Sequence, residues 1–182
     1  PLIQALTDEL ASPIQSRFRL QGFKMQIIET LGKLGDGRAV EPLIQALGIV
    51  EGIDSAIINS LLQIEDDNTV PHLLQLIVTG DERVRSASAR ALGQLKDQRA
   101  TAPLIQTLND KDKDVREASA IVLGQLGDKQ AVDPLIQALS NEDERIRAAS
   151  AEALGQLEDI RAVEPLIQAL TDELASPIQS RF

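Results

Sequence analysis

The chain contains no cysteine, tryptophan or tyrosine, and aromatic residues make up 2% of its 182 positions. The lack of cysteine excludes disulfides, thiolate metal sites and cysteine nucleophiles, and it leaves the redox compartment open. No apolar run approaches the roughly 20 residues that span a bilayer, and no charged-then-apolar leader precedes the first motif. We therefore expect a soluble, cytoplasmic protein with no membrane partner.

Basic residues are scarce relative to acidic ones. The chain has 18 Lys and Arg against 28 Asp and Glu, which gives a formal net charge of -10. Such a surface repels phosphate backbones unless the basic residues cluster, so nucleic acid is not an expected partner. Hydrophobic residues make up 43% of the chain, which is typical of a globular protein whose core is built from Leu, Ile, Val and Ala.

Two motifs recur in step along the chain. The leucines of the "PLIQAL" motif are spaced by 30, 31, 31 and 31 residues, at Leu43, Leu73, Leu104, Leu135 and Leu166. The second motif is typified by "ASARALGQL", and its leucines are Leu31, Leu61, Leu92, Leu123 and Leu154. A fixed period of this length indicates a tandem array of small structural units.

Each repeat is expected to form two helices. In residues 84–95 the apolar positions recur at helical spacing, and the proline of "EPLIQAL" suits the first turn of a second helix. Gly and Asp residues between the two segments are stop and turn signals. Because two helices of about 12 residues cannot bury their apolar stripes alone, the repeats must stack. We therefore predict an all-α fold, an α-solenoid.

The predicted organisation is a single repeat array over residues 1–182. It divides into a half repeat at 1–6, a long repeat with an insertion at 7–47, regular repeats at 48–78, 79–108, 109–139 and 140–170, and a truncated repeat at 171–182 that copies 7–18. The insertion predicts a longer first helix from about residue 13 to residue 34, since Ser12 and Pro13 form a helix start.

The pattern "VR..A..ALGQLGD..AV.PLIQAL" resembles the HEAT-like repeat of the phycobilin lyase type, a short subclass of HEAT repeats. Matches are good from 83 to 170 and weaker from 24 to 78. The chain departs from the pattern at Leu62, which replaces a glycine, at Asp54, which replaces an arginine, and at His72, which replaces the helix proline. The resemblance implies the fold more than the function, because such repeats serve as scaffolds in many unrelated proteins.

A glutamine occupies the same position of every second helix, two residues after the shared leucine and off the buried stripe. The resemblance implies that this helix lines a concave surface, where amides and carboxylates would suit an extended polar or basic peptide. Alternatively, glutamine is present only because it favours a helix. The predicted partner-binding residues are Glu41, Gln45, His72, Gln75, Gln106, Asp133, Gln137, Glu164 and Gln168.

Other recurring polar residues are expected to be structural. An aspartate in each inter-helix turn is predicted to cap the second helix, and an arginine two positions on to pair with an adjacent repeat. The predicted capping residues are Asp36, Asp67, Asp97, Asp128 and Asp159. Arg85, Arg116 and Arg147, near the start of the first helices, are expected to bridge repeats in the same way.

No catalytic, cofactor or metal site is predicted. His72 is the only histidine, and no nucleophile and orienting acid accompany it in a recognisable set. The acidic run "NDKDKD" at 109–114 lacks the glycine and terminal glutamate of an EF-hand loop.

All three phenylalanines lie in the insertion or in its C-terminal copy, and basic residues accompany them. Aromatic and arginine side chains are the usual anchors of interfaces, so exposed members of this group are candidate hot spots. Alternatively, the phenylalanines fill a gap made by the longer helix. The candidate anchors are Phe18, Phe23, Arg17 and Arg19.

Residues 1–18 and 165–182 are identical, and their offset of 164 residues equals the total of the four intervals given above and the 41 residues from Leu2 to Leu43. The duplicate is therefore in phase with the array, whether it is natural, engineered or a fragment boundary. Neither end carries a polar capping repeat, so the apolar residues there are expected to contact a partner, namely Leu2, Ile3, Leu6, Leu170 and Ile178. This predicts a homo-oligomer or a longer array, formed by head-to-tail contact or by swapping.

The leading functional prediction is a non-enzymatic scaffold, without cofactor, that binds a protein or peptide partner on its concave second-helix face. The alternative is a phycobilin lyase subunit or relative that binds an open-chain tetrapyrrole for attachment to an antenna protein. The aromatic and basic residues that a bilin would be expected to contact are confined to the insertion.

Overall fold

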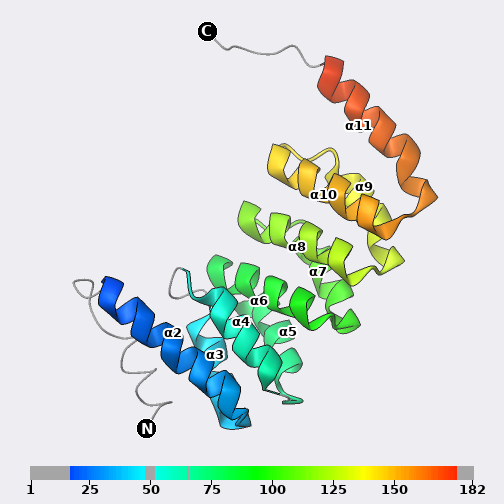
Figure 1. Cartoon of the computed structure of the whole chain (residues 1–182). Coiled ribbons are helices and arrows are strands. Elements are labelled where there is room, and N and C mark those ends of the chain that lie inside the picture. The colour runs from blue at the N-terminus through cyan, green and yellow to red at the C-terminus, as the bar shows by residue number, and fades with distance from the viewer. Residues whose placement is uncertain (1–16, 48–51, 65, 176–182) are drawn as a thin grey trace. The chain divides into compact units, whose positions relative to one another are not determined.

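The structure, a computed structural model, describes residues 17–47, 52–64 and 66–175; the side chains of 17–21 and 175 lie outside this description. All regular elements of these residues are helices (Figure 1), and the predicted all-α solenoid is confirmed. The chain divides into two compact units, the first ending at Asp97 and the second beginning at Gln98. The repeat boundaries given above stay a prediction.

Within its described residues, unit 1 contains three first helices with two second helices between them. Its elements are α2 (Arg17–Leu34), η2 (Gly37–Ala39), α3 (Val40–Ala46), α4 (Asp54–Gln63), α5 (Thr69–Thr79) and α6 (Glu82–Leu95). The long first helix predicted for the insertion is α2. The part of that prediction before residue 17 lies outside the described residues.

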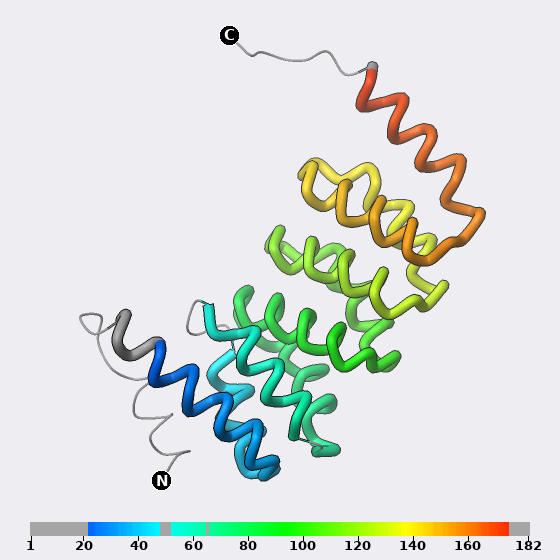
Figure 2. Tube along the Cα trace, viewed as in Figure 1, coloured from blue at the N-terminus to red at the C-terminus, as the bar shows by residue number. Residues whose placement is uncertain are grey.

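Unit 2 continues the alternation from a second helix. Its elements are η3 (Gln98–Ala100), α7 (Thr101–Thr107), α8 (Lys113–Leu126), η4 (Lys129–Ala131), α9 (Val132–Ala138), α10 (Glu144–Leu157), η5 (Ile160–Ala162) and α11 (Val163–Ala175). Figure 2 shows the traces of α8 and α10 side by side, and these two first helices pack together along their length.

The core lies where each second helix meets the first helix that follows it in the chain. The pairs α3 with α4, α5 with α6, α7 with α8 and α9 with α10 all pack in this way. Leu43, Leu73, Leu104 and Leu135, the repeated leucines of these second helices, are fully buried. The seam between repeats is thus an aliphatic contact built from the same motif positions each time.

A glycine near the end of the first helix permits close packing on the next first helix. An added Cβ would lie 2.8 Å from the Cα of Ser60 at Gly32 and 2.7 Å from the Cα of Ala153 at Gly124. Both obstacles are backbone atoms, so neither could move aside cheaply. Gly155 holds the same place in α10, yet a Cβ there would meet nothing within 4 Å.

Aspartates cap the 3-10 turns that precede the second helices. Asp36 accepts from the backbone N–H of Arg38 at 3.0 Å, and Asp159 from that of Arg161 at 3.1 Å. Hydrogen bonds from the arginine side chain and backbone lower the pKa of each carboxyl to about 2. In the second repeat the cap is Asp66, which accepts from Asn68, because the 30-residue spacing shifts the register by one. The prediction that Asp67 is the cap was therefore wrong by one residue.

Arginines near the start of the first helices tie each helix to the turn before it. Arg85 Nη1 donates to the Gly80 carbonyl at 2.8 Å, and Arg116 Nη1 donates to the Asp110 carbonyl at 2.7 Å. Arg147 repeats the contact with Asn141 at 2.9 Å. These contacts are structural, but each lies within one predicted repeat, so they do not show the bridging between repeats that was expected. Arg147 also donates to Glu173, which belongs to the next predicted repeat.

Candidate functional site

Four of the predicted partner-binding residues gather around one cavity in unit 1. Its volume is about 390 Å³, and α3 and α5 supply its polar lining. The cavity, called the Glu41 cavity below, is lined by Glu41, Gln45, His72 and Gln75 together with Ile44, Leu76, Gly80 and Val84. The repeat spacing placed these residues on second helices, and the stacking of α3 on α5 brings them together.

Hydrogen bonding arranges the polar side of the Glu41 cavity. Gln45 Nε2 donates to Glu41 Oε1 at 2.8 Å, which fixes the carboxylate on its own helix. His72 Nε2 lies 3.6 Å from Glu41 Oε2, too far for a hydrogen bond but close enough for an ion pair when the imidazole is protonated. His72 Nδ1 is buried and has no hydrogen-bond partner in the part of the chain described here. The cavity therefore offers an acceptor for N–H groups or cations, and imidazole and amide donors, beside an aliphatic wall.

The predicted residues of unit 2 do not converge in the same way. Gln106, Asp133, Gln137, Glu164 and Gln168 are all exposed on α7, α9 and α11. Asp133 accepts from Arg161 Nη1 at 3.0 Å, and Gln168 donates to Asp172 at 2.8 Å. Within the described ranges, no hydrogen bond joins two of these amides into a ladder.

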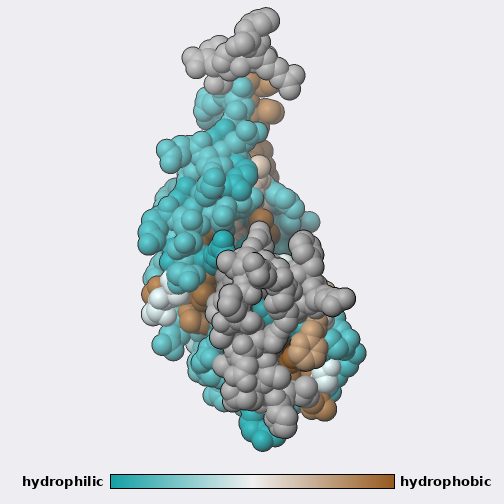
Figure 3. Space-filling model, turned by 90° about the vertical axis from the view of Figure 1, so that its left-hand side faces the viewer, coloured by the Kyte–Doolittle hydropathy of each residue, from teal (hydrophilic) through white to brown (hydrophobic). Residues whose placement is uncertain are grey.

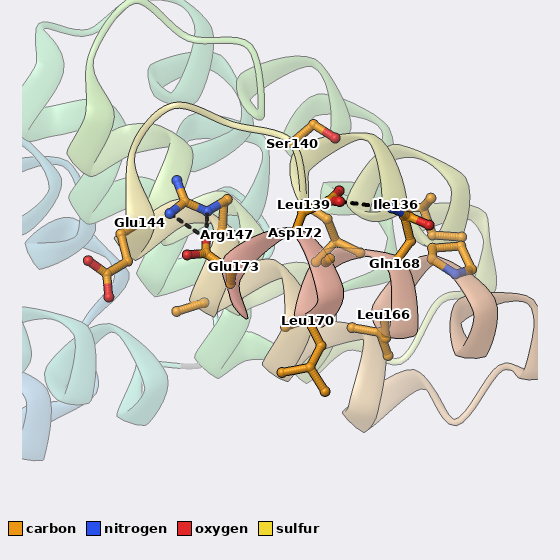
Figure 4. A pocket seen from close by; sticks show the side chains of 14 residues that line it. Ile136, Leu139, Ser140, Glu144, Arg147, Leu166, Gln168, Leu170, Asp172 and Glu173 are labelled. Atoms are coloured by element: carbon orange, nitrogen blue, oxygen red, sulfur yellow. Dashed lines mark hydrogen bonds and ion pairs between the residues drawn. The ribbon is translucent and has the colours of Figure 1, made fainter. Parts of the chain in front are cut away.

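A larger opening, which the sequence did not indicate, lies in unit 2 between α9, α10 and α11. Its volume is about 860 Å³, and its lining includes Leu139, Arg147, Ala151, Leu166, Leu170 and Glu173. Arg147 Nε donates to Glu173 Oε1 at 2.7 Å, and Figure 4 shows the two side chains pointing toward each other from α10 and α11. This opening is called the α10–α11 groove below.

The candidate anchors of the insertion lie on α2. Phe23 is 54% exposed, and the neighbouring Met25 is exposed as well. Phe18, Arg17 and Arg19 belong to the same helix, but their side chains lie outside the described residues. Phe23 thus does not fill a gap inside the described part of unit 1.

Neither a metal cluster nor a membrane span is found in residues 17–47, 52–64 and 66–175. No group of three His, Asp or Glu side chains there is placed to hold a metal ion. No helix in the same ranges has the length and apolar character needed to cross a bilayer.

Comparison with known families identifies the repeats. The family of HEAT repeats matches residues 51–119 and 101–181. The chain belongs to the HEAT-repeat family. The PBS lyase HEAT-like repeat matches residues 24–48, so the resemblance drawn from the motifs is confirmed. No curated protein sequence gives a match to this HEAT-repeat chain.

Among solved structures, the HEAT-repeat chain is similar to the complex of CpcE and CpcF of phycocyanin lyase from Nostoc sp. PCC7120. The TM-score is 0.58 at 24% identity, and the alignment covers 93% of this chain and 70% of that chain. At this identity the likeness shows a common fold.

These matches correct one prediction made from the sequence. The chain was predicted not to be an enzyme, because no catalytic set was visible. The match of residues 24–48 to the PBS lyase HEAT-like repeat contradicts that prediction. The signal lies in the type of repeat and not in a nucleophile with its partners, so the lack of a recognisable catalytic set was no guide to it.

Proposed function

We propose that this HEAT-repeat chain is a subunit of a bilin lyase, or a relative of such a subunit, and holds an open-chain tetrapyrrole for attachment to an antenna protein. The match of residues 24–48 to the PBS lyase HEAT-like repeat carries the proposal. The likeness to a phycocyanin lyase complex over 93% of the chain supports it.

The Glu41 cavity is the proposed contact site for the tetrapyrrole. The segment that matches the lyase repeat supplies Glu41, Ile44 and Gln45 to its lining. Pyrrole N–H groups are donors, and a carboxylate such as Glu41 accepts them through charge-assisted hydrogen bonds. Donors from His72 and Gln75 suit a propionate, and the aliphatic wall suits the ring faces.

The cavity is sized for part of the pigment. Small-molecule sites commonly span about 300–1,000 Å³, and this one has about 390 Å³. In the proposal, the remaining rings lie against a protein partner, as the neighbouring structure is a complex of two proteins. The proposed partner contacts on unit 2 are Gln106, Asp133, Gln137, Glu164 and Gln168.

Binding to this chain is non-covalent in the proposal. The chain has no cysteine, so a thioether to a bilin cannot form on it. Its role is then to hold and orient the pigment, while the covalent bond forms on the acceptor protein.

The test is a titration of the chain with phycocyanobilin, followed by visible absorption. We expect a shift that saturates at one pigment per chain. Glu41→Gln removes the charge and should weaken binding roughly tenfold or more, the usual weight of a charge-assisted hydrogen bond. Gln75→Leu should weaken it less, and Gln137→Leu, at the same repeat position in unit 2, is the matched control.

Two outcomes contradict the proposal. An unchanged spectrum at stoichiometric pigment would rule out bilin binding by the chain. Equal losses from Gln75→Leu and Gln137→Leu would place the pigment elsewhere than the Glu41 cavity.

A further inference from the structure

The last second helix, α11, presents an apolar face that is not covered in the described structure. Val163, Ile167, Leu170 and Leu174 are 47%, 52%, 61% and 78% exposed, and their spacing places them on one side of the helix. Figure 3 shows hydrophobic residues along one side of the segment just below the upper grey atoms, where α11 lies. Val132 and Leu139, which match Val163 and Leu170 in the repeat before, are buried.

The exposure follows from how the repeats pack. Every earlier second helix packs on the first helix that comes after it. In the described residues α11 has no such partner, and its main contact is with the short turn η5 just before it. The uncovered face is therefore apolar and lies where a further first helix would pack.

The α10 side of the α10–α11 groove is open at the corresponding positions. Ala120 and Gly124 of α8 are buried, and Gly124 lies under the backbone of Ala153 in the next first helix. Their counterparts on α10 are Ala151, which lines the groove, and Gly155, which has free space above it. Both walls of the groove thus lack the same neighbour, a first helix.

We propose that α2 of a second copy of this chain occupies the α10–α11 groove. Residues 165–182, which include most of α11, repeat residues 1–18 letter for letter and in phase with the array. In the sequence, α2 begins at Arg17, within the last two residues of the 1–18 copy, and continues beyond it to Leu34. The sequence thus already has one first helix, α2, after a stretch identical to most of α11, and a second copy of the chain can supply that helix.

The surface of α2 fits this role. Phe23 occupies the repeat position of Ile53, Val115 and Ile146, which are all fully buried, yet Phe23 is more than half exposed. By the same register Thr30 of α2 corresponds to Ser60 and Ala153, the residues that cover Gly32 and Gly124. In the proposed contact Thr30 lies over Gly155, and Phe23 enters the groove.

The charges of the two helices are opposite. The α2 sequence has four basic residues and one acidic residue, whereas α11 has three acidic residues and no basic one. Opposite charge favours encounter and fixes the partner's orientation more than it adds affinity. The complementarity distinguishes α2 from α10, whose first turn is acidic at Glu144.

The contact joins different surfaces of two copies, so it is heterologous and can repeat from copy to copy. The second copy's own residues 1–11 have the same sequence as 165–175, so a test of the contact has to distinguish these two identical stretches. This inference does not depend on bilin binding.

The experiment is light scattering of the full chain from micromolar to millimolar concentration, at moderate salt. We expect the average mass of the wild type to rise with concentration. Leu170→Glu should weaken association roughly tenfold or more, because it places a charge on the buried face of the contact. Leu6→Glu is the matched control, since it makes the same change in an identical stretch that is not part of the proposed contact, and it should not weaken association.

A second variant separates docking from folding. Gly155→Gln keeps α10 helical and fits the free space of a single copy, but it obstructs the approach of Thr30. We expect a well-folded chain with reduced association. A wild type that stays monomeric at millimolar concentration overturns the proposal and leaves the groove to a different protein. Equal effects of Leu170→Glu and Leu6→Glu, or full association of Gly155→Gln, overturn it as well.

Discussion

Replacing Gly155 by alanine should stabilise the chain, whereas the same change at Gly124 should destabilise it. Both glycines occupy the same place near the end of a 14-residue first helix. The helix-propensity gain from glycine to alanine is therefore equal at the two sites, about 0.5–1 kcal/mol. At Gly155 nothing opposes it, because an added Cβ meets no atom within 4 Å.

At Gly124 the same Cβ would lie 2.7 Å from the Cα of Ala153, so α8 and α10 would have to separate. Overpacking of this kind costs about 1–3 kcal/mol, which outweighs the propensity gain. The assay is urea unfolding followed by circular dichroism, at a concentration where light scattering finds single chains. If both variants change the free energy of unfolding in the same direction, close packing at Gly124 is not what the glycine provides, and the reasoning fails.

Two further predictions concern the core and the turns. Leu123→Ala removes a fully buried side chain and should lower the free energy of unfolding by about 2–5 kcal/mol. Ile121→Ala, at an exposed position of the same helix, should change that free energy by less than about 0.5 kcal/mol. Comparable losses from the two variants would contradict the assigned core. For Asp159, hydrogen bonds from Arg161 lower the folded-state pKa to about 2. The carboxylate therefore stabilises the fold at pH values above its ordinary pKa near 4, and this stabilisation is lost as the pH falls through about 2. Asp159→Asn should therefore melt below the wild type near neutral pH and converge with it near pH 2, and a constant difference in melting temperature across this range would refute the assignment.

The spacing of the motifs predicted most of the fold, because local helix signals and a fixed period are properties of the sequence alone. The helical face of residues 84–95 and the first-turn prolines follow from periodicity and backbone chemistry. The cap at Asp66 was missed, because the interval from Leu43 to Leu73 is 30 residues and not 31. The cap keeps its distance from the shared leucine, so it lies at Asp66 and not at Asp67.

The candidate site was less predictable, because it depends on how neighbouring helices stack. The glutamines share one repeat position, yet Gln45 and Gln75 line a cavity while Gln168 bonds to Asp172 on its own helix. The exposure of Leu170 could not be read from its motif either, since Leu47 and Leu139 end the same PLIQAL motif and are buried. Burial in an array is decided by the next repeat along, which the residue's own motif does not encode.

Because the contact between repeats is the same each time, whole repeats can be added or removed. Since α7 meets α8 through the same positions at which α9 meets α10, removal of one whole 31-residue repeat would bring together two surfaces that already match. A deletion of half that length would instead place a second helix against a second helix. Such a pair would have neither the close glycine contact found between first helices nor the leucine contact found between a second helix and the following first helix. Recombination within such a gene would therefore preserve folding only when it moves whole repeats, so the array can lengthen or shorten without any new interface having to evolve.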